Sequence, residues 1–329
     1  MKARILVGDV RTRLSEIPDQ SVQSCVTSPP YFGLRDYGND AQIGLEPSLQ
    51  DYVDELVKVF REVKRVLRDD GTLWLNLGDS YSGSGKGRNP DGTVHVSALI
   101  AKQGTSAGTV MGDVPSGIVP EGLKPKDLMG VPWRVAFALQ ADGWYLRQDI
   151  IWAKPNPMPE SVTDRCTKSH EYLFLLSKSA KYYFDNQAIK EPAATKPHSP
   201  GNILHESKIA GPNDRGGSSQ WETEMDKVWG SDGLRNKRDV WTINTKPFKG
   251  AHFAVMPEAL VEPCILAGSK EGDTILDPFS GSGTVGLVAL TNNREYLGVE
   301  LNPQYAEMSV ERIGLGAELE QVWGIGVRA

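Results

Sequence analysis

The chain has 329 residues, 39% of them hydrophobic and 24% charged, which excludes a largely disordered chain and allows one large α/β domain or two smaller ones. The formal net charge of −6 excludes a protein that binds polyanions through bulk attraction alone. Counted by segment, the net charge is −1 over residues 1–185, +2 over 186–250 and −7 over 251–329, so a surface for polyanions is expected only in the first two segments.

The first part of the chain alternates between strand and helix patterns. Short apolar runs that end in polar residues predict buried strands at 3–9 and 21–28. An apolar stripe at helical spacing predicts a helix over 49–71, closed by Gly71, and the run 72–80 predicts the next strand. Strand, helix and strand in this order indicate parallel βαβ units.

Two stretches interrupt this pattern. Residues 82–122 are rich in Gly and Ser and predict a long mobile loop, and residues 186–245 lose periodicity and predict an inserted region with much coil. The other elements expected are helices at 126–143, 256–269, 283–293 and 303–314 and strands at 144–155, 170–179, 181–185, 273–279 and 295–301. The predicted fold is a doubly wound, mainly parallel, Rossmann-like α/β sheet with an insertion.

Neither a membrane segment nor a signal peptide is expected. The chain has no run of about 18 apolar residues, and its N-terminus, MKARILVGDV, lacks the long apolar region and the small-residue cleavage site of a signal peptide. The three cysteines, Cys25, Cys166 and Cys264, suggest neither a disulfide framework nor a zinc site, because they are odd in number and widely spaced. The sequence therefore predicts a cytoplasmic protein with no metal and no membrane partner.

A glycine-rich turn near the C-terminus predicts a cofactor site. The strand TILDPF runs into SGSGTVGLVAL, so Gly281 and Gly283 lie at a strand-to-helix turn, where a ligand can approach the backbone and the helix N-terminus favours negative charge. The next strand ends with Glu300, 19 residues after Gly281, where a carboxylate can hold both hydroxyls of a ribose. The pattern predicts a cofactor that contains adenosine.

Two cofactors compete for this site. Gly281, Gly283 and Gly286 match the G-x-G-x-x-G fingerprint of NAD-binding proteins. Asp277 in the preceding DPF would repel a pyrophosphate, whereas it can pair with the ammonium group of a methionine moiety. The sign of this charge favours S-adenosyl-L-methionine over NAD.

A second unusual stretch is VTSPPYF at 26–32. Two prolines can simply stiffen a turn, but this stretch begins a series of motifs that runs in the order of a known family: TSPPYFGLRDYG, GTLWLNLGDSY, GWYLRQDIIWAKPNPMPES, HFAVMPEALVEPCILAG, DPFSGSGT and YLGVELNPQY. From ILVGD to residue 313 the chain resembles the amino-methylating DNA methyltransferases of the β arrangement. In that family the SPPY catalytic motif precedes the cofactor motif, and a target-recognition region lies between them.

The resemblance implies site-specific methylation of double-stranded DNA in a restriction–modification setting, with S-adenosyl-L-methionine as the methyl donor. It implies a catalytic part at 1–185, which includes the loop at 82–122, a target-recognition region at 186–245 and a cofactor-binding part at 246–329. A cognate restriction endonuclease and a homodimer are compatible with this family, and the sequence decides neither.

The chemistry of amino methylation explains the residues of the SPPY motif. The lone pair of an exocyclic amino nitrogen is delocalised into the ring, so acceptors for both amino hydrogens must pull the nitrogen towards tetrahedral geometry. We expect the Ser28 hydroxyl to accept one hydrogen and the Pro29 carbonyl the other, with Pro30 completing the stiff turn. Tyr31 is expected to stack on the base once it has left the duplex.

The resemblance also implies roles for residues around the cofactor. Glu300 would bind the ribose, Asp277 and Thr284 the methionine end, and Asp9 would lie near the adenine, with Phe279, Gly281 and Gly283 lining the pocket and His252 and Phe253 helping to close it. Asp9 could instead be a helix or turn cap, His252 a structural histidine and Phe253 a core residue.

Several alternatives stay open. Ser in the first position of the motif favours cytosine N4 as the target, whereas family members with Asp there mostly methylate adenine N6. Cys264, in a Pro-Cys dipeptide, could attack carbon 5 of cytosine, but its helical surroundings favour a buried small hydrophobe. RNA or a protein amide is a less favoured substrate. Outside the enzymes, the alternative is a non-catalytic DNA-binding protein that retains the cofactor pocket.

Contacts to DNA are expected in two places. Arg235, Lys237 and Arg238 in the inserted region could meet phosphates or guanine edges, although a solvated charged surface explains them equally well. Lys86 and Arg88 in the glycine-rich loop could close over the DNA backbone, which predicts that this loop becomes ordered on binding.

Overall fold

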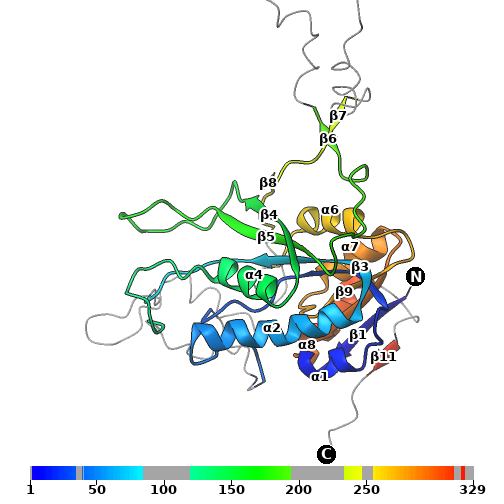
Figure 1. The fold of residues 1–329 in the computed structure, drawn as a ribbon, viewed down its shortest axis with the longest axis horizontal. Coiled ribbons are helices and arrows are strands. Elements are labelled where there is room, and N and C mark those ends of the chain that lie inside the picture. The colour runs from blue at the N-terminus through cyan, green and yellow to red at the C-terminus, as the bar shows by residue number, and fades with distance from the viewer. Residues whose placement is uncertain are drawn as a thin grey trace, which may run out of the picture. The chain divides into compact units, whose positions relative to one another are not determined.

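The computed structural model describes residues 2–34, 39, 41–83, 119–193, 233–246, 255–314 and 320–322. Within them the chain forms an α/β fold around one large sheet (Figure 1). The helices are α1 (Val10–Ser15), α2 (Leu49–Val66), α4 (Val131–Ala141), α6 (Glu258–Gly268), α7 (Thr284–Thr291) and α8 (Pro303–Ile313). The strands are β1 (Ala3–Val7), β2 (Val22–Thr27), β3 (Leu67–Leu77), β4 (Tyr145–Ala153), β5 (His170–Ser177), β6 (Glu191–Pro192), β7 (Leu234–Arg235), β8 (Val240–Thr242), β9 (Thr274–Asp277), β10 (Glu295–Glu300) and β11 (Glu320–Val322).

The large sheet has the strand order β11-β1-β10-β9-β2-β3-β5-β4-β8. Strands from β11 to β3 pair in parallel, and β5 runs antiparallel to both of its neighbours, β3 and β4. This confirms the expected mainly parallel, doubly wound sheet. Because β1, β10, β9 and β2 are parallel neighbours, the loops that follow them gather at one edge of the sheet, where ligands bind in open α/β folds.

Two helical layers cover the sheet. Helices α1, α2 and α4 pack together in one layer, and α6, α7 and α8 form the other. Alternate residues of β3 point to the two layers: Leu73 and Leu75 belong to the core cluster that includes α2, whereas Trp74 lies beside Gly268 of α6. A fully buried leucine of this kind stabilises the fold by roughly 2 kcal/mol. None of the described helices combines the length and the apolar character that crossing a bilayer requires.

The chain divides into two compact units, Met1–Phe184 with Asp239–Ala329, and Asp185–Arg238. In the smaller unit β6 pairs antiparallel with β7, and Glu191 accepts hydrogen bonds from Arg235 Nε at 2.9 Å and from Arg238 Nε at 2.6 Å. β8, at Val240–Thr242, pairs with β4 in the sheet of the larger unit. The expected limits of the recognition region, 186–245, stay a prediction.

Two boundaries differ from those expected. The helix expected over 49–71 ends at Val66, and the next strand begins at Leu67 rather than at residue 72. Gly71 does not close the helix. It lies inside β3, where an added Cβ would come within 2.9 Å of the Arg68 carbonyl oxygen, so glycine serves close backbone packing there. The helix expected from residue 126 begins at Val131, because Asp79 accepts the N–H groups of Gly130 and Val131 at its start.

Two further segments differ. Residues 181–185 do not form the strand expected there. Their contacts are individual ones, with Tyr183 N–H donating to the Asp70 carbonyl at 2.9 Å and Phe184 stacking on Trp74. Conversely, the structure contains helix α1, which the sequence analysis does not predict. It is short, and its sequence signal is Asp9 as N-cap before an apolar pair at Val10 and Leu14.

Candidate active site

A cavity of about 490 Å³ lies at the edge where β1, β10, β9 and β2 end. Most of its lining comes from the ends of these strands and the segments that follow them, at 8–10, 28–31, 277–282 and 300–305, together with residues of the segment 41–43. Cavities of roughly 300–1,000 Å³ hold small molecules and cofactors. The sheet thus brings the SPPY motif and the glycine-rich turn to the same cavity.

Asp277 supplies a buried carboxyl group at the end of β9. Its Oδ1 accepts hydrogen bonds from Thr27 Oγ1 at 2.7 Å and from Phe279 N–H at 3.1 Å. No described residue donates to Oδ2, and the side chain lines the cavity, so this oxygen is available to a ligand. Burial, reinforced by the charge of Glu300, raises the pKa of Asp277 to about 7.

Glu300 lies beside it, at the end of β10. Its Oε2 accepts Gly281 N–H at 2.7 Å and its Oε1 accepts Asn302 N–H at 2.9 Å. Burial raises the pKa of Glu300 even though these backbone donors favour the charged form. Each oxygen keeps further lone pairs, so the carboxylate can accept two more hydrogen bonds from a ligand in the cavity.

The N-terminus of α7 presents donors to the same cavity. Arg312 Nη1 donates to Ser282 Oγ at 3.0 Å and to Thr284 Oγ1 at 2.8 Å. Because both hydroxyl oxygens accept from a cation, their hydrogens are free to point at an anionic group. Gly283, the N-cap of α7, has φ 75°, and an added Cβ would lie 2.2 Å from Ser309 Oγ, so the turn requires glycine here.

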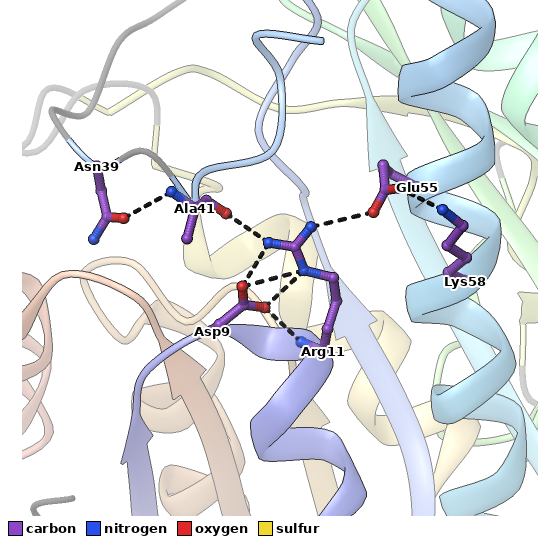
Figure 2. A network of polar contacts seen from close by, with 6 residues as sticks. All are labelled: Asp9, Arg11, Asn39, Ala41, Glu55 and Lys58. Carbon is purple, nitrogen blue, oxygen red and sulfur yellow. Dashed lines mark hydrogen bonds and ion pairs between the residues drawn. The ribbon is translucent and has the colours of Figure 1, made fainter.

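Asp9 is tied to Arg11 rather than left open to the cavity (Figure 2). Arg11 donates to both Asp9 oxygens, from its backbone N–H at 2.8 Å, from Nε at 2.9 Å and from Nη2 at 2.5 Å. The same guanidinium donates to Glu55 at 3.2 Å and to the Ala41 carbonyl at 3.0 Å, and Asn39 Oδ1 accepts Ala41 N–H. Burial would raise the pKa of Asp9, but the contacts with Arg11 lower it below its usual value. Asp9 is thus the cap of α1, and Arg11 joins it to α2 and to the cavity wall at 41–43.

The SPPY motif follows β2 and is held from two sides. Tyr52 Oη donates to the Pro30 carbonyl at 2.8 Å, whereas no described residue donates to the Pro29 carbonyl. The Tyr31 ring lies against Gly78, where an added Cβ would come within 2.6 Å of the ring. Tyr31 Oη donates to Glu171 at 2.8 Å and lies 3.5 Å from Ser28 Oγ.

Some expected site residues lie elsewhere. His252, Phe253, Lys86 and Arg88 fall outside the described residues. Arg235, Lys237 and Arg238 belong to the smaller unit.

Cys264 is fully buried in α6, its Sγ donates to the Leu260 carbonyl at 3.2 Å, and it does not line the cavity. This confirms the expectation of a buried small hydrophobe. It also removes Cys264 as a nucleophile acting in this cavity.

Five residues that position the site were not expected from the sequence: Arg11, Thr27, Tyr52, Glu171 and Arg312. Thr27 adjoins the SPPY motif and could have been singled out by that position alone. Tyr52, Glu171 and Arg312 act across the sheet or from another helix, and Arg11 also reaches Glu55 and Ala41, which are distant in sequence. No local pattern marks these contacts.

The comparisons with known proteins agree with this site. The N6_N4_Mtase family model, described as DNA methylase, matches residues 22–311. The type II methyltransferase M.Cfr9I of Citrobacter freundii is 49% identical over 312 residues, which cover 94% of this chain and 87% of that protein. The type II methyltransferase M.SmaI of Serratia marcescens is 48% identical over 310 residues, covering 94% and 90%.

Solved structures share the fold at low sequence identity. The PvuII DNA methyltransferase (cytosine-N4-specific) superposes with a TM-score of 0.60 at 18% identity over 95% of this chain and 86% of that chain. A Thermus thermophilus protein described as a putative DNA modification methylase, solved in complex with S-adenosyl-L-methionine, gives a TM-score of 0.55 at 23% identity over 97% of this chain and 99% of that chain. The family match over most of the chain and the two close relatives show that this chain belongs to the N6/N4 DNA methylase family.

Proposed function

We propose that the protein transfers a methyl group from S-adenosyl-L-methionine to the N4 amino group of a cytosine flipped out of double-stranded DNA. The observation that carries this proposal is one cavity that holds both an acidic cofactor site, with Asp277 and Glu300, and the Ser28 hydroxyl. The motif order, with Ser28 far ahead of the glycine-rich turn, supports the β arrangement.

The cavity suits this cofactor group by group. When bound, S-adenosyl-L-methionine supplies an electrophilic methyl group on a sulfonium. Asp277 Oδ2 would pair with the ammonium, and Glu300 would accept the ribose hydroxyls beside the backbone donors it already holds. The hydroxyls of Ser282 and Thr284, turned outward by Arg312, would donate to the carboxylate at the N-terminus of α7.

The adenine would lie near Asp9, along the wall at 41–43 that Arg11 holds. Because Arg11 engages both oxygens of Asp9, we assign Asp9 an indirect role, in which it positions the wall through Arg11. Phe279, Gly281 and Thr284 line the same cavity. His252 and Phe253 stay candidates for closing it.

Ser28 and Pro29 would act on the target amino group. The Ser28 oxygen and the Pro29 carbonyl accept its two hydrogens, so the nitrogen lone pair turns towards the methyl carbon. The nitrogen would form the new bond to the methyl carbon as the methyl–sulfur bond breaks, the sulfur would leave as an uncharged thioether, and the nitrogen would release one proton to solvent. Tyr31 stacks on the flipped base, which leaves the duplex because its amino group cannot be reached inside the stack.

The choice of cytosine N4 over adenine N6 rests on the neutral hydroxyl at Ser28, where a carboxylate would be the stronger acceptor. The cytosine-N4-specific PvuII enzyme, which shares the fold, supports the same choice. The relatives are named type II methyltransferases, which supports duplex DNA as the substrate and a restriction–modification setting. A cognate endonuclease and a homodimer stay predictions.

The product of the reaction tests the proposal. Duplex DNA incubated with the protein and the methyl donor, then digested to nucleosides, should contain N4-methylcytosine by mass spectrometry. N6-methyladenine instead would refute the choice of cytosine, and no methylated nucleoside from varied duplexes would favour the non-catalytic alternative.

Ser28→Ala tests the role of the hydroxyl. It should lower the single-turnover rate about 100-fold or more, because one acceptor of the transition state is lost, and leave the Kd for the cofactor unchanged. Ser21→Ala, in a turn where the hydroxyl contacts only the Pro18 carbonyl among described residues, is the matched control. A Ser28→Ala variant at the wild-type rate would contradict the proposed mechanism.

A further inference from the structure

A chain of hydrogen bonds begins at the Ser28 hydroxyl, and in it Ser28 is the donor rather than the acceptor. Ser28 Oγ donates to Tyr31 Oη at 3.5 Å, and Tyr31 Oη donates to Glu171 Oε2 at 2.8 Å. Glu171 comes from β5, on the far side of β3 from the SPPY motif. The chain ends on a carboxylate, which can accept hydrogens but has none to give when ionised.

Glu171 is held in place by donors on β3 and just after the end of β4. Lys154 Nζ forms an ion pair with Oε1, and Asn76 Nδ2 donates to Oε2 at 3.2 Å and to the Tyr172 carbonyl at 3.1 Å. The Lys154 ammonium lies 4.1 Å from the centre of the Trp152 ring. Both side chains of the ion pair are mostly buried, with 16% of Lys154 and 15% of Glu171 exposed, so the carboxylate has a fixed position and fixed neighbours.

The direction of each hydrogen bond follows from this end point. Tyr31 has one hydroxyl hydrogen, and it is donated in the hydrogen bond to Glu171. Burial and the charge of Glu171 raise the pKa of Tyr31 well above its usual value, so the phenol stays protonated and keeps donating. The Tyr31 oxygen can then only accept from Ser28. The Ser28 hydrogen therefore points at Tyr31, and the Ser28 lone pairs are left for another donor.

We propose that Glu171, oriented by Lys154, is a positioning residue that fixes Ser28 as a hydrogen-bond acceptor for the target amino group, acting through Tyr31. This inference rests on the proposed role of Ser28. Neither Lys154 nor Glu171 lines the cavity, so the ion pair would act on the reaction indirectly.

Replacing the carboxylate by an amide should reverse the chain. In Glu171→Gln, the Lys154 ammonium attracts the amide oxygen, so the amide NH₂ turns towards Tyr31. Tyr31 Oη then accepts from Gln and donates to Ser28, whose own hydrogen is pushed towards the amino group. Two donors then face each other where a donor and an acceptor are needed.

A double-mutant cycle tests this inference. Glu171→Gln should lower the single-turnover methylation rate about 10- to 100-fold, the range expected for losing one hydrogen bond to a charged group, and leave the Kd for S-adenosyl-L-methionine unchanged. In a Tyr31→Phe background, which lacks the linking hydroxyl, the same substitution should change the rate by less than about twofold. Equal losses in the two backgrounds, or a wild-type rate for Glu171→Gln, overturn the inference.

A second variant covers the case in which Glu171→Gln folds poorly. In Lys154→Met/Glu171→Gln the amide oxygen is free to turn towards its two donors, Tyr31 and Asn76, so the rate should recover to within about threefold of the wild type. Rates are compared per folded molecule, because an ion pair that served only stability would change the folded fraction and leave the rate of each folded molecule unchanged. A double variant that folds and stays as slow as Glu171→Gln overturns the inference.

Glu62→Gln is the matched control, because Glu62 pairs with Arg65 on α2 and does not line the cavity. It should leave the rate unchanged, and a loss equal to that of Glu171→Gln would overturn the inference. The Ser28→Ala result distinguishes a failure of the proposed function from a failure of the proposed role of Glu171. If Ser28→Ala is inactive while the cycle is additive, the proposed function stands and the role of Glu171 falls; if Ser28→Ala is fully active, both fall.

Discussion

At the scale of single residues, Asp277 has the clearest chemical consequence. The residue is 2% exposed, and burial raises the pKa of its carboxyl from 3.8 to about 7, so near neutral pH both the protonated and the ionised form are populated when no ligand is bound. A cation in the cavity would favour the ionised form. The ionised form of Asp277 thus lowers the stability of the ligand-free protein and supplies a negative charge to the cavity.

Cofactor affinity should therefore depend on pH through Asp277. The ammonium pairs with the carboxylate, which is the minor form at pH 6 and the major form at pH 8, so the Kd for S-adenosyl-L-methionine should fall about tenfold between these values. Isothermal titration calorimetry at several pH values measures this. Asp277→Asn should bind weakly and lose the pH dependence, and a variant that kept the wild-type profile would exclude Asp277 as its source.

The same group should affect stability with the opposite sign. Its folded-state pKa is raised, so its favourable contribution is complete below about pH 4 and is lost as pH rises through about 7. At pH 8 the buried charge costs the ligand-free protein at most on the order of 4 kcal/mol, so Asp277→Asn should raise Tm there. Asp54→Asn, on the surface of α2, is the control and should leave both Tm and affinity unchanged.

At the scale of elements, α1 holds one side of the cavity together, because it follows β1 and contacts both α2 and the segment 41–43. The helix was not expected from the sequence, yet its second residue, Arg11, bonds to Asp9, to Glu55 of α2 and to the Ala41 carbonyl (Figure 2). One guanidinium thus fixes the cavity wall at 41–43 relative to the end of β1.

Arg11→Met should release this wall while keeping the apolar stem of the side chain. We expect the Kd for the cofactor to rise about tenfold, because hydrogen bonds to charged groups contribute about 1.5–3 kcal/mol and part of this orders the wall. Fluorescence or calorimetric titration checks it. Arg61→Met removes another arginine–aspartate pair, with Asp142, away from the cavity and should have no effect on Kd. Equal Kd values for the two variants would contradict a role for Arg11.

At the scale of the whole molecule, the smaller unit carries the cations that the sequence marked for DNA. Arg235 and Arg238 both donate to Glu191 through Nε, so this carboxylate competes with a phosphate for their positive charge. The net effect on DNA binding is a competition between one internal anion and many external ones.

Salt dependence of DNA binding tests this competition. The triple variant Arg235→Ala/Lys237→Ala/Arg238→Ala should bind duplex DNA more weakly, and the slope of log K against log salt should shrink by about 0.9 for each phosphate that the protein no longer neutralises. Glu191→Gln should act in the opposite direction and strengthen binding. Arg61→Ala, which removes one positive charge from the larger unit, should leave the slope unchanged. Unchanged slopes for the triple variant would place the DNA surface elsewhere.

The sequence by itself determined the local parts of this protein. The strands at the N-terminus, the helices and strands between residues 255 and 314, the SPPY turn and the glycine-rich turn all follow from periodicity and turn chemistry within short windows. Acidic residues next to a glycine turn also fixed the sign of the charge offered to a cofactor, because that sign depends only on which residues are present.

Only the tertiary structure decided which of these parts meet. Thr27 bonds to Asp277 across 250 positions, and Tyr31 bonds to Glu171 across 140, because β2 lies between β9 and β3 and β5 follows β3 in the sheet. The order of the strands in the sheet determines such contacts. The apolar pattern of a buried strand predicts that the strand is buried, but not which strands lie beside it. The sequence could therefore predict the chemistry of Ser28 and Asp277, whereas the residues that hold the rest of the site, Arg11 at Ala41, Tyr52 at Pro30 and Glu171 at Tyr31, emerged only from the folded structure.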